Sequence, residues 1–228
     1  MGLNLPKRKS IFRGNTESSE IRAEFGDQKL IRSNYLKTEI ADAFLGSSLD
    51  SGYWDSLTNG TASIAVGSDE VNLSTGATSA STARISKDLS EGDVSVVEFE
   101  ARVKFDAGDP AGATNNNFGI LNTAGDGAGG IFFAAKDDNT VRIVADDEAE
   151  SGAFDIDIAV DTTSYQNYKI ILEEKIAYFF INNNLVGEIK KGEASFPPFK
   201  TFRVQISITN SGATDRDMDV NWVRVRTQ

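Results

Sequence analysis

Apolar and polar residues alternate along long stretches of this chain, and the alternation predicts β-strands. In residues 97–105 every second side chain is apolar, from Val97 to Phe105, and the side chains between them are charged. Because successive side chains of a strand point to opposite faces, such a segment has one buried face and one face in solvent. Residues 202–208 show a similar alternation. We therefore expect the interior of the fold to contain Val97, Phe99, Val103, Tyr168, Ile170, Phe202, Val204 and Ile206.

The segment 165–188 predicts two long strands, a tight turn and the start of a third strand. Its residues 176–181 are a dense apolar run, which favours a central strand covered on both faces. The run Asn182–Asn184 closes a hairpin, because asparagine tolerates the positive φ of a tight turn. Residues 30–44 fit either a short helix or an extended connector. Further strands are predicted at 61–66, 70–73, 83–86, 118–121, 131–135, 141–144, 154–160 and 218–225. Many short strands with almost no helix indicate an all-β, two-sheet antiparallel sandwich.

Composition excludes several classes of chemistry. The 228 residues include neither cysteine nor histidine, which excludes a disulfide scaffold, a thiolate metal site, a cysteine nucleophile and a Ser-His triad. The longest apolar run, 176–181, is too short to cross a bilayer, and the first residues lack the apolar core of a signal peptide. We expect a single domain of this size to fold without disulfide cross-links. We also expect no membrane partner.

The charge is divided unevenly along the chain, whose formal net charge is −11. Residues 1–40 hold eight Lys/Arg and five Asp/Glu, a net of +3, which leaves fifteen and twenty-nine, a net of −14, for residues 41–228. We divide the chain into a basic extended arm, 1–41, and a β-sandwich, 42–228. An acidic body repels phosphate backbones, so we expect no nucleic-acid partner.

The basic arm is either a solvated tail or a docking segment. Its cations are interleaved with apolar side chains, which combines charge attraction with apolar anchoring. Repeated over a homo-oligomer, several weak contacts of this kind would hold a subunit firmly. We predict partner docking by Leu5, Lys7, Arg8, Lys9, Ile11, Phe12 and Arg13.

Three stretches resemble one known family. They are 44–50 followed by Trp54, 168–171 leading to the turn near Asn182, and 218–225. They are similar to the first strand, the hairpin and the closing strand of the concanavalin A-like jelly rolls. This family includes legume lectins, laminin G-like modules and laminarinase-type glycoside hydrolases. The resemblance covers about 42–228 and implies a jelly-roll sandwich, but the fold hosts many functions.

The resemblance also implies where catalytic carboxylates would lie. The family's hydrolases carry an E-x-D-x-E or E-x-D-x-x-E pattern on one concave strand, so that alternate carboxylates converge on one glycosidic bond. The corresponding segment here, 130–135, has no carboxylate. The nearest imitation is Asp155, Asp157 and Asp161. We therefore expect no catalytic residue, no glycosidase activity and a protein that is not an enzyme.

Other candidate sites are weaker, and we expect no cofactor. The acidic clusters at 146–148 and 215–219 have oxygen ligands that suit calcium, but an acidic turn is the favoured explanation of each of them. The calcium candidates are Asp215, Asp217 and Asp219. Aromatic residues could stack on a sugar ring, and the candidates are Tyr53, Trp54, Tyr165 and Trp222. Because both tryptophans lie in the fold-defining stretches, we expect them to pack in the core.

Three functions remain in order of preference. Jelly rolls of this type occur as accessory modules on virus particles, particularly tailed phages, and the basic arm fits that use. The first hypothesis is therefore a non-catalytic virion protein, a capsid decoration or tail accessory protein, docked through its arm onto a major capsid or tail protein. The alternative is a carbohydrate-binding attachment module for a cell-surface glycan. The third is a glycoside hydrolase. A virion location is expected, with the cytoplasm as the alternative.

Overall fold

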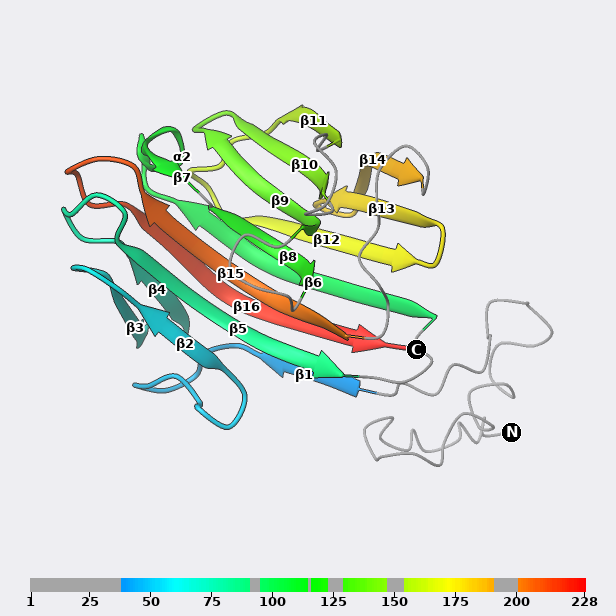
Figure 1. The fold of residues 1–228 in the computed structure, drawn as a ribbon, viewed down its shortest axis with the longest axis horizontal. Helices are drawn as coiled ribbons and strands as arrows, with labels where there is room; N and C mark the ends of the chain where they lie inside the picture. The colour runs from blue at the N-terminus through cyan, green and yellow to red at the C-terminus, as the bar shows by residue number, and fades with distance from the viewer. Residues whose placement is uncertain (1–37, 91–94, 115, 123–128, 147–153, 191–200) are drawn as a thin grey trace, which may run out of the picture.

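The fold is a sandwich of two antiparallel sheets (Figure 1). The computed structural model describes residues 38–90, 95–114, 116–122, 129–146, 154–190 and 201–228. Sheet A has the order β14-β13-β12-β6-β16-β4-β3, with β1 also paired to β16. Sheet B has the order β11-β10-β9-β8-β15-β5-β2, with β7 also paired to β15. The predicted two-sheet antiparallel architecture is confirmed.

The chain crosses several times between the two sheets. Sheet A consists of β1 (Thr38–Asp42), β3 (Ser63–Gly67), β4 (Glu70–Ser74), β6 (Val96–Phe105), β12 (Gln166–Glu173), β13 (Ile176–Ile181), β14 (Asn184–Lys190) and β16 (Asp217–Thr227). Sheet B consists of β2 (Asp55–Thr58), β5 (Thr82–Ser90), β7 (Ala113–Thr114), β8 (Asn117–Asn122), β9 (Gly130–Asp137), β10 (Thr140–Asp146), β11 (Phe154–Ala159) and β15 (Thr201–Asn210). One helical turn, α2 (Asp109–Gly112), follows β6.

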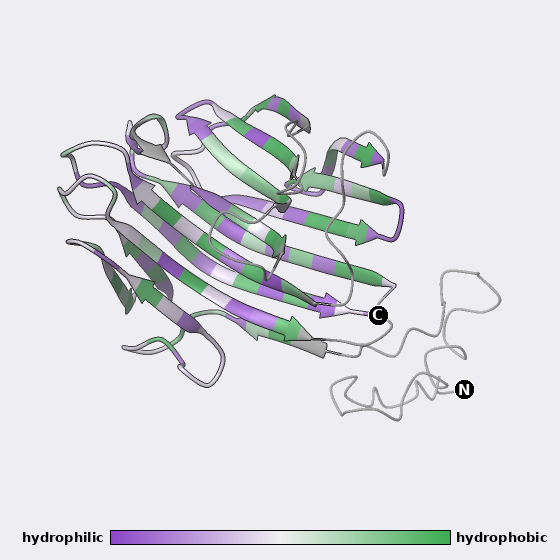
Figure 2. Ribbon diagram, viewed as in Figure 1, coloured by the Kyte–Doolittle hydropathy of each residue, from purple (hydrophilic) through white to green (hydrophobic). Residues whose placement is uncertain are grey.

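The core lies between the two sheets, where the apolar face of each strand meets the other sheet. Figure 2 shows the alternation of apolar and polar residues along single strands. All eight residues predicted to face the interior are buried, with exposed fractions of 2% or less. Five rings from both sheets form a connected cluster in the centre of the core: Phe105, Phe118, Phe133, Tyr168 and Phe179. The predicted assignment of buried and outward-facing residues is therefore correct in the strands of both sheets.

The predicted hairpin is also present, with one difference. Asn182 and Asn183 have φ values of 50° and 65°, which closes a tight turn between β13 and β14. However, β13 is not covered on both faces, because its residues alternate between buried and half-buried. It lies next to the edge strand β14, where the outward face of sheet A has no described layer upon it.

The basic arm lies almost entirely outside the described residues. The docking candidates Leu5, Lys7, Arg8, Lys9, Ile11, Phe12 and Arg13 fall in this part of the chain, so their docking role stays a prediction. Of the ambiguous segment 30–44, residues 38–42 form the strand β1 beside the end of β16. Within the described ranges, no helix is long and apolar enough to span a membrane.

Candidate functional site

The outward face of sheet B carries the side chains that do not enter the core. Strand pairing places one residue from each of seven strands side by side, because residues directly opposite in an antiparallel pair share a face. This central row crosses the whole sheet and consists of Asp55, Ser86, Gln205, Gly119, Phe132, Val144 and Asp155. In the sequence these residues are spread between positions 55 and 205.

A glycine at the centre of the row sets the shape of this face. A Cβ at Gly119 would lie 2.7 Å from the Ile131 carbonyl oxygen and 2.7 Å from Phe132 Cα, so only glycine allows β8 and β9 this spacing. Phe132 is half-buried and is opposite Gly119, while Gln205 is opposite it on the other side. No side chain therefore stands between the Phe132 ring and the Gln205 amide along the row.

Amide and hydroxyl groups form a small network beside this centre. Ser207 Oγ donates to Asn117 Oδ1 at 2.6 Å, and Gln205 Nε2 donates to the same oxygen at 3.3 Å. Gln205 and Ser207 expose only 7% and 3% of their surfaces, so the network holds these side chains in fixed positions. Planar amides held in this way are suited to binding hydroxyl groups.

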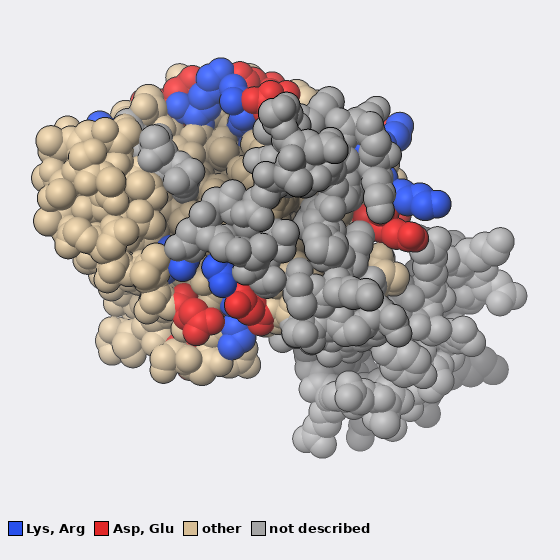
Figure 3. Space-filling model, viewed as in Figure 1, with Lys and Arg blue, Asp and Glu red and all other residues tan. Residues whose placement is uncertain are grey.

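Charged groups lie toward both ends of the face (Figure 3). On one side Arg203 Nε contacts Asp88 Oδ1 at 2.7 Å. On the other side the Arg142 guanidinium contacts Asp155 at 2.6 Å and Asp157 at 2.8 Å, and Lys136 Nζ contacts Asp157 at 2.5 Å. The hydrogen bonds from Arg142 and Lys136 lower the pKa of Asp157 to about 2. Asp157 is therefore a carboxylate at any ordinary pH.

The carboxylates expected from the family resemblance lie only partly where a catalytic pair would need them. The outward side chains of β9 are Phe132, Ala134 and Lys136, so this strand presents no carboxylate. Asp155 and Asp157 project together from the edge strand β11, which β10 separates from β9. Asp161 lies in the turn after β11, where it accepts hydrogen bonds from Thr163 and Ser164. The three aspartates do not converge.

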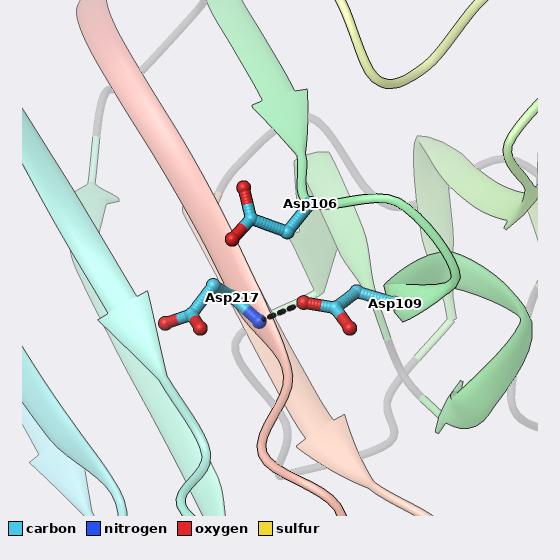
Figure 4. Close-up of side chains that lie close together, drawn as sticks. All are labelled: Asp106, Asp109 and Asp217. Atoms are coloured by element: carbon cyan, nitrogen blue, oxygen red, sulfur yellow. Dashed lines mark hydrogen bonds between the residues drawn. The ribbon is translucent and has the colours of Figure 1, made fainter.

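A second acidic group forms where β6, α2 and β16 meet (Figure 4). One oxygen each from Asp106, Asp109 and Asp217 lies within 4.8 Å of the others. Asp109 Oδ2 accepts a hydrogen bond of 2.7 Å from the Asp217 backbone N–H, and Oδ1 is 3.2 Å from Arg216. Burial raises the pKa of Asp109 and that of Asp217. The oxygen atoms suit a hard cation, but Asp109 already ties α2 to β16.

Of the calcium candidates proposed from the sequence, the structure brings only Asp217 into this group. Asp219 instead pairs with Lys104 at 2.9 Å, and Asp215 accepts a hydrogen bond of 2.8 Å from Ser74. Sequence reasoning missed Asp106 and Asp109, since they lie more than a hundred positions before β16 and no local spacing relates them to it.

The four aromatic candidates are also separated. Trp54 is buried in the core, as expected, with an exposed fraction of 2%. The expectation that Trp222 packs in the core is wrong, because the Trp222 side chain is half-buried and lies outside the hydrophobic core. Tyr165 lies under the charges of Arg102 and Lys104, at 4.9 and 5.1 Å from its ring centre. Tyr53 is 47% exposed.

Comparison with known proteins identifies the fold. No family model and no curated protein matches the chain. Its structure is similar to the catalytic domain of an endo-1,3-β-glucanase (laminarinase) from Thermotoga petrophila, with a TM-score of 0.66 and 14% identity over 82% of this chain and 96% of that one. It is also similar to the endo-β-1,3-glucanase of Pyrococcus furiosus, with a TM-score of 0.65 and 15% identity over 85% and 94% of the two chains. A third similar structure is SCLam, a non-specific endo-β-1,3(4)-glucanase of family GH16, with a TM-score of 0.64 and 14% identity over 82% and 89%.

These similarities confirm the concanavalin A-like jelly roll and correct one prediction. The prediction that the chain is not an enzyme is contradicted, because the similar structures are endo-acting glucanases, a class that fits the glycoside hydrolase hypothesis. A virion role finds no support in these similarities, and the virion partners and location stay predictions.

Proposed function

We propose that this protein binds a polysaccharide across the outward face of sheet B. The observation that carries the proposal is the central row, in which the Phe132 ring and the Gln205 amide flank the bare backbone of Gly119. A sugar ring has an apolar C–H face that packs on an aromatic ring, and hydroxyl groups that bond to amides. Both kinds of group, an aromatic ring and an amide, lie here along one line.

The direction of the row favours a polymer over a single sugar. It crosses seven strands, with polar side chains from Asp55 to Gln205 at one end, Phe132 and Val144 past the central glycine, and Asp155 at the other end. The similar structures are named as enzymes that cut β-1,3- and β-1,3(4)-glucans. Laminarin and mixed-linkage β-glucan are therefore the first ligands to test.

Replacing Phe132 by alanine is expected to weaken laminarin binding by about ten- to hundredfold, because burying one such ring contributes about 1.5–3 kcal/mol. Isothermal titration calorimetry of the full chain measures the change in Kd. Tyr178→Ala is the matched control, since Tyr178 is a half-buried aromatic residue on the outward face of sheet A. If Phe132→Ala and Tyr178→Ala leave Kd equally unchanged, the proposed binding face is wrong.

Cleavage of the bound polysaccharide is the second candidate function, and the pair Asp155 and Asp157 favours it. Glycoside hydrolysis needs two carboxyl groups on either side of the scissile bond. These two project from one strand at alternate positions and contact the same guanidinium, at Arg142 Nη1 and Nε. With its pKa near 2, Asp157 suits the role of the ionised nucleophile or base and not that of the acid.

The variant Asp157→Asn is expected to lower the rate at which laminarin yields new reducing ends by at least about a hundredfold. Because the pKa of Asp157 is lowered to about 2, the residue stays ionised above that pH, so wild-type activity should not fall between pH 7 and 4 on its account. Asp88→Asn, at the other end of the face, is the control. Equal rates for wild type and Asp157→Asn would remove this pair from any cleavage mechanism.

A further inference from the structure

Two adjoining hollows lie beside β1: the larger is on the outward face of sheet A, and the smaller is at the turn that follows β1. The larger has a volume of about 360 Å³ and is lined by Trp222, Glu100 and Arg224 together with residues 41–43 and Val223. The smaller, of about 230 Å³, is lined by Tyr53, Leu45 and Asp50 among others. Ala41 and Asp42 of β1 line both, so the hollows are two parts of one surface site. The larger volume is within the range of small-ligand sites.

A β-bulge places Trp222 in the larger hollow. The register between β16 and β6 shifts between Val220 and Trp222, which inserts one extra residue into β16. As a result Asn221 and Trp222 both lie outside the core, while Val220 and Val223 on either side of them are buried. Bulges commonly re-aim a side chain in this way. The largest aromatic side chain of this strand is therefore directed toward a ligand-sized hollow.

The polar groups of the larger hollow are held in place by one another. Arg224 Nη2 donates to Glu100 Oε2 and lies 4.0 Å from Glu98. The Glu100 side chain is 12% exposed and that of Arg224 is 34% exposed, so both reach the surface from fixed positions. A paired carboxylate and guanidinium offer acceptors and donors side by side without adding a net charge.

The smaller hollow is shaped by a pinned turn after β1. Asp42 Oδ1 accepts a hydrogen bond of 2.7 Å from the Phe44 backbone, and Oδ2 accepts one of 2.8 Å from Trp54 Nε1. Phe44 has a φ of 51°, in a region that a bulky residue rarely occupies. Its ring packs into the core, while Leu45 is left 74% exposed and Tyr53 47% exposed. Two large side chains thus stand in solvent beside the hollow.

We propose that this surface is a second saccharide-binding site, with one sugar ring on Trp222 and the next unit toward Tyr53. A neutral, hydroxyl-rich ligand is favoured over an anionic one, because the Arg224 charge is already paired and Asp42 and Asp50 repel anions. The choice of ligand class rests on the proposed polysaccharide binding by sheet B. Because the two sites lie on opposite outward faces, one molecule would hold two segments of a polysaccharide and gain avidity.

The stoichiometry of glucan oligosaccharide binding tests this site. Laminarihexaose is titrated by calorimetry into the full-length wild type, Trp222→Ala, Phe132→Ala and the double variant. The expected result is two sites in wild type, one in each single variant and none in the double variant. Tyr53→Ala changes an exposed residue, so it tests the site even if Trp222→Ala fails to fold, and it should weaken one site by about tenfold. Tyr178→Ala is the aromatic control on the same sheet face.

The outcomes separate the two proposals. If Phe132→Ala removes all binding while Trp222→Ala and Tyr53→Ala change nothing, the second site is wrong and the face of sheet B stands. If Trp222→Ala removes all binding while Phe132→Ala changes nothing, the second site stands alone. Wild type that binds neither laminarihexaose nor mixed-linkage and agarose oligosaccharides would overturn both. Dimerisation that depends on Trp222 without any glycan, seen by sedimentation, would assign the surface to a second copy of the chain and overturn the saccharide site.

Discussion

Replacing Phe133 by alanine is expected to lower the free energy of unfolding by about 3–5 kcal/mol. Phe133 is fully buried at the centre of the aromatic cluster. Its ring centre lies 5.6 Å from that of Phe118 in the same sheet, and 5.1 and 5.3 Å from those of Tyr168 and Phe179 in the other sheet. The substitution would leave a cavity at the point where both sheets meet, and strands on every side limit its collapse.

Urea denaturation followed by tryptophan fluorescence measures this effect. Phe132→Ala is the matched control, because Phe132 is the next residue along β9 and points to the opposite face. We expect Phe132→Ala to lower the free energy of unfolding by less than half as much, because the Phe132 ring lies outside the hydrophobic core. Equal losses for the two variants would show that the alternation along β9 has been assigned to the wrong faces.

Replacing Asp42 by alanine is expected to lower the free energy of unfolding by about 2–4 kcal/mol, because two donors lose a charged acceptor and each loss costs about 1–3 kcal/mol. One donor is the indole N–H of Trp54, which is buried at 2% exposure beneath the turn after β1. The other is the Phe44 backbone N–H, whose bond helps to hold the positive φ of that residue. The change would loosen the turn that shapes the smaller hollow on sheet A.

Thermal and urea denaturation compare Asp42→Ala with Asp50→Ala. Asp50 also accepts a backbone hydrogen bond, from Gly52 at 2.8 Å, but this bond is exposed and water replaces it readily. We expect Asp50→Ala to lower the free energy of unfolding by less than about 1 kcal/mol. A loss for Asp42→Ala no larger than that for Asp50→Ala would mean that the Trp54 indole is satisfied in another way.

The sequence by itself determined the architecture. The period of two along 97–105 and 202–208 identified the buried faces, because the direction of each side chain in a strand depends only on its position in that strand. The tight turn at Asn182 and Asn183 was equally predictable, since it depends on the φ values that asparagine tolerates. Such features are local, and a local pattern contains the information that specifies them.

Only the tertiary structure decided which residues form a site. Gln205, Gly119 and Phe132 become neighbours through the pairing of β15 with β8 and of β8 with β9. Asp106 and Asp109 meet Asp217 across a hundred positions, and Trp222 faces outward because a bulge shifts β16 by one residue. The pairing of distant strands and the position of a bulge depend on how whole sheets pack, since each strand could pair in several registers with similar local energies. Hydrophobic alternation therefore fixed which side chains are buried, and sheet packing fixed which exposed side chains meet.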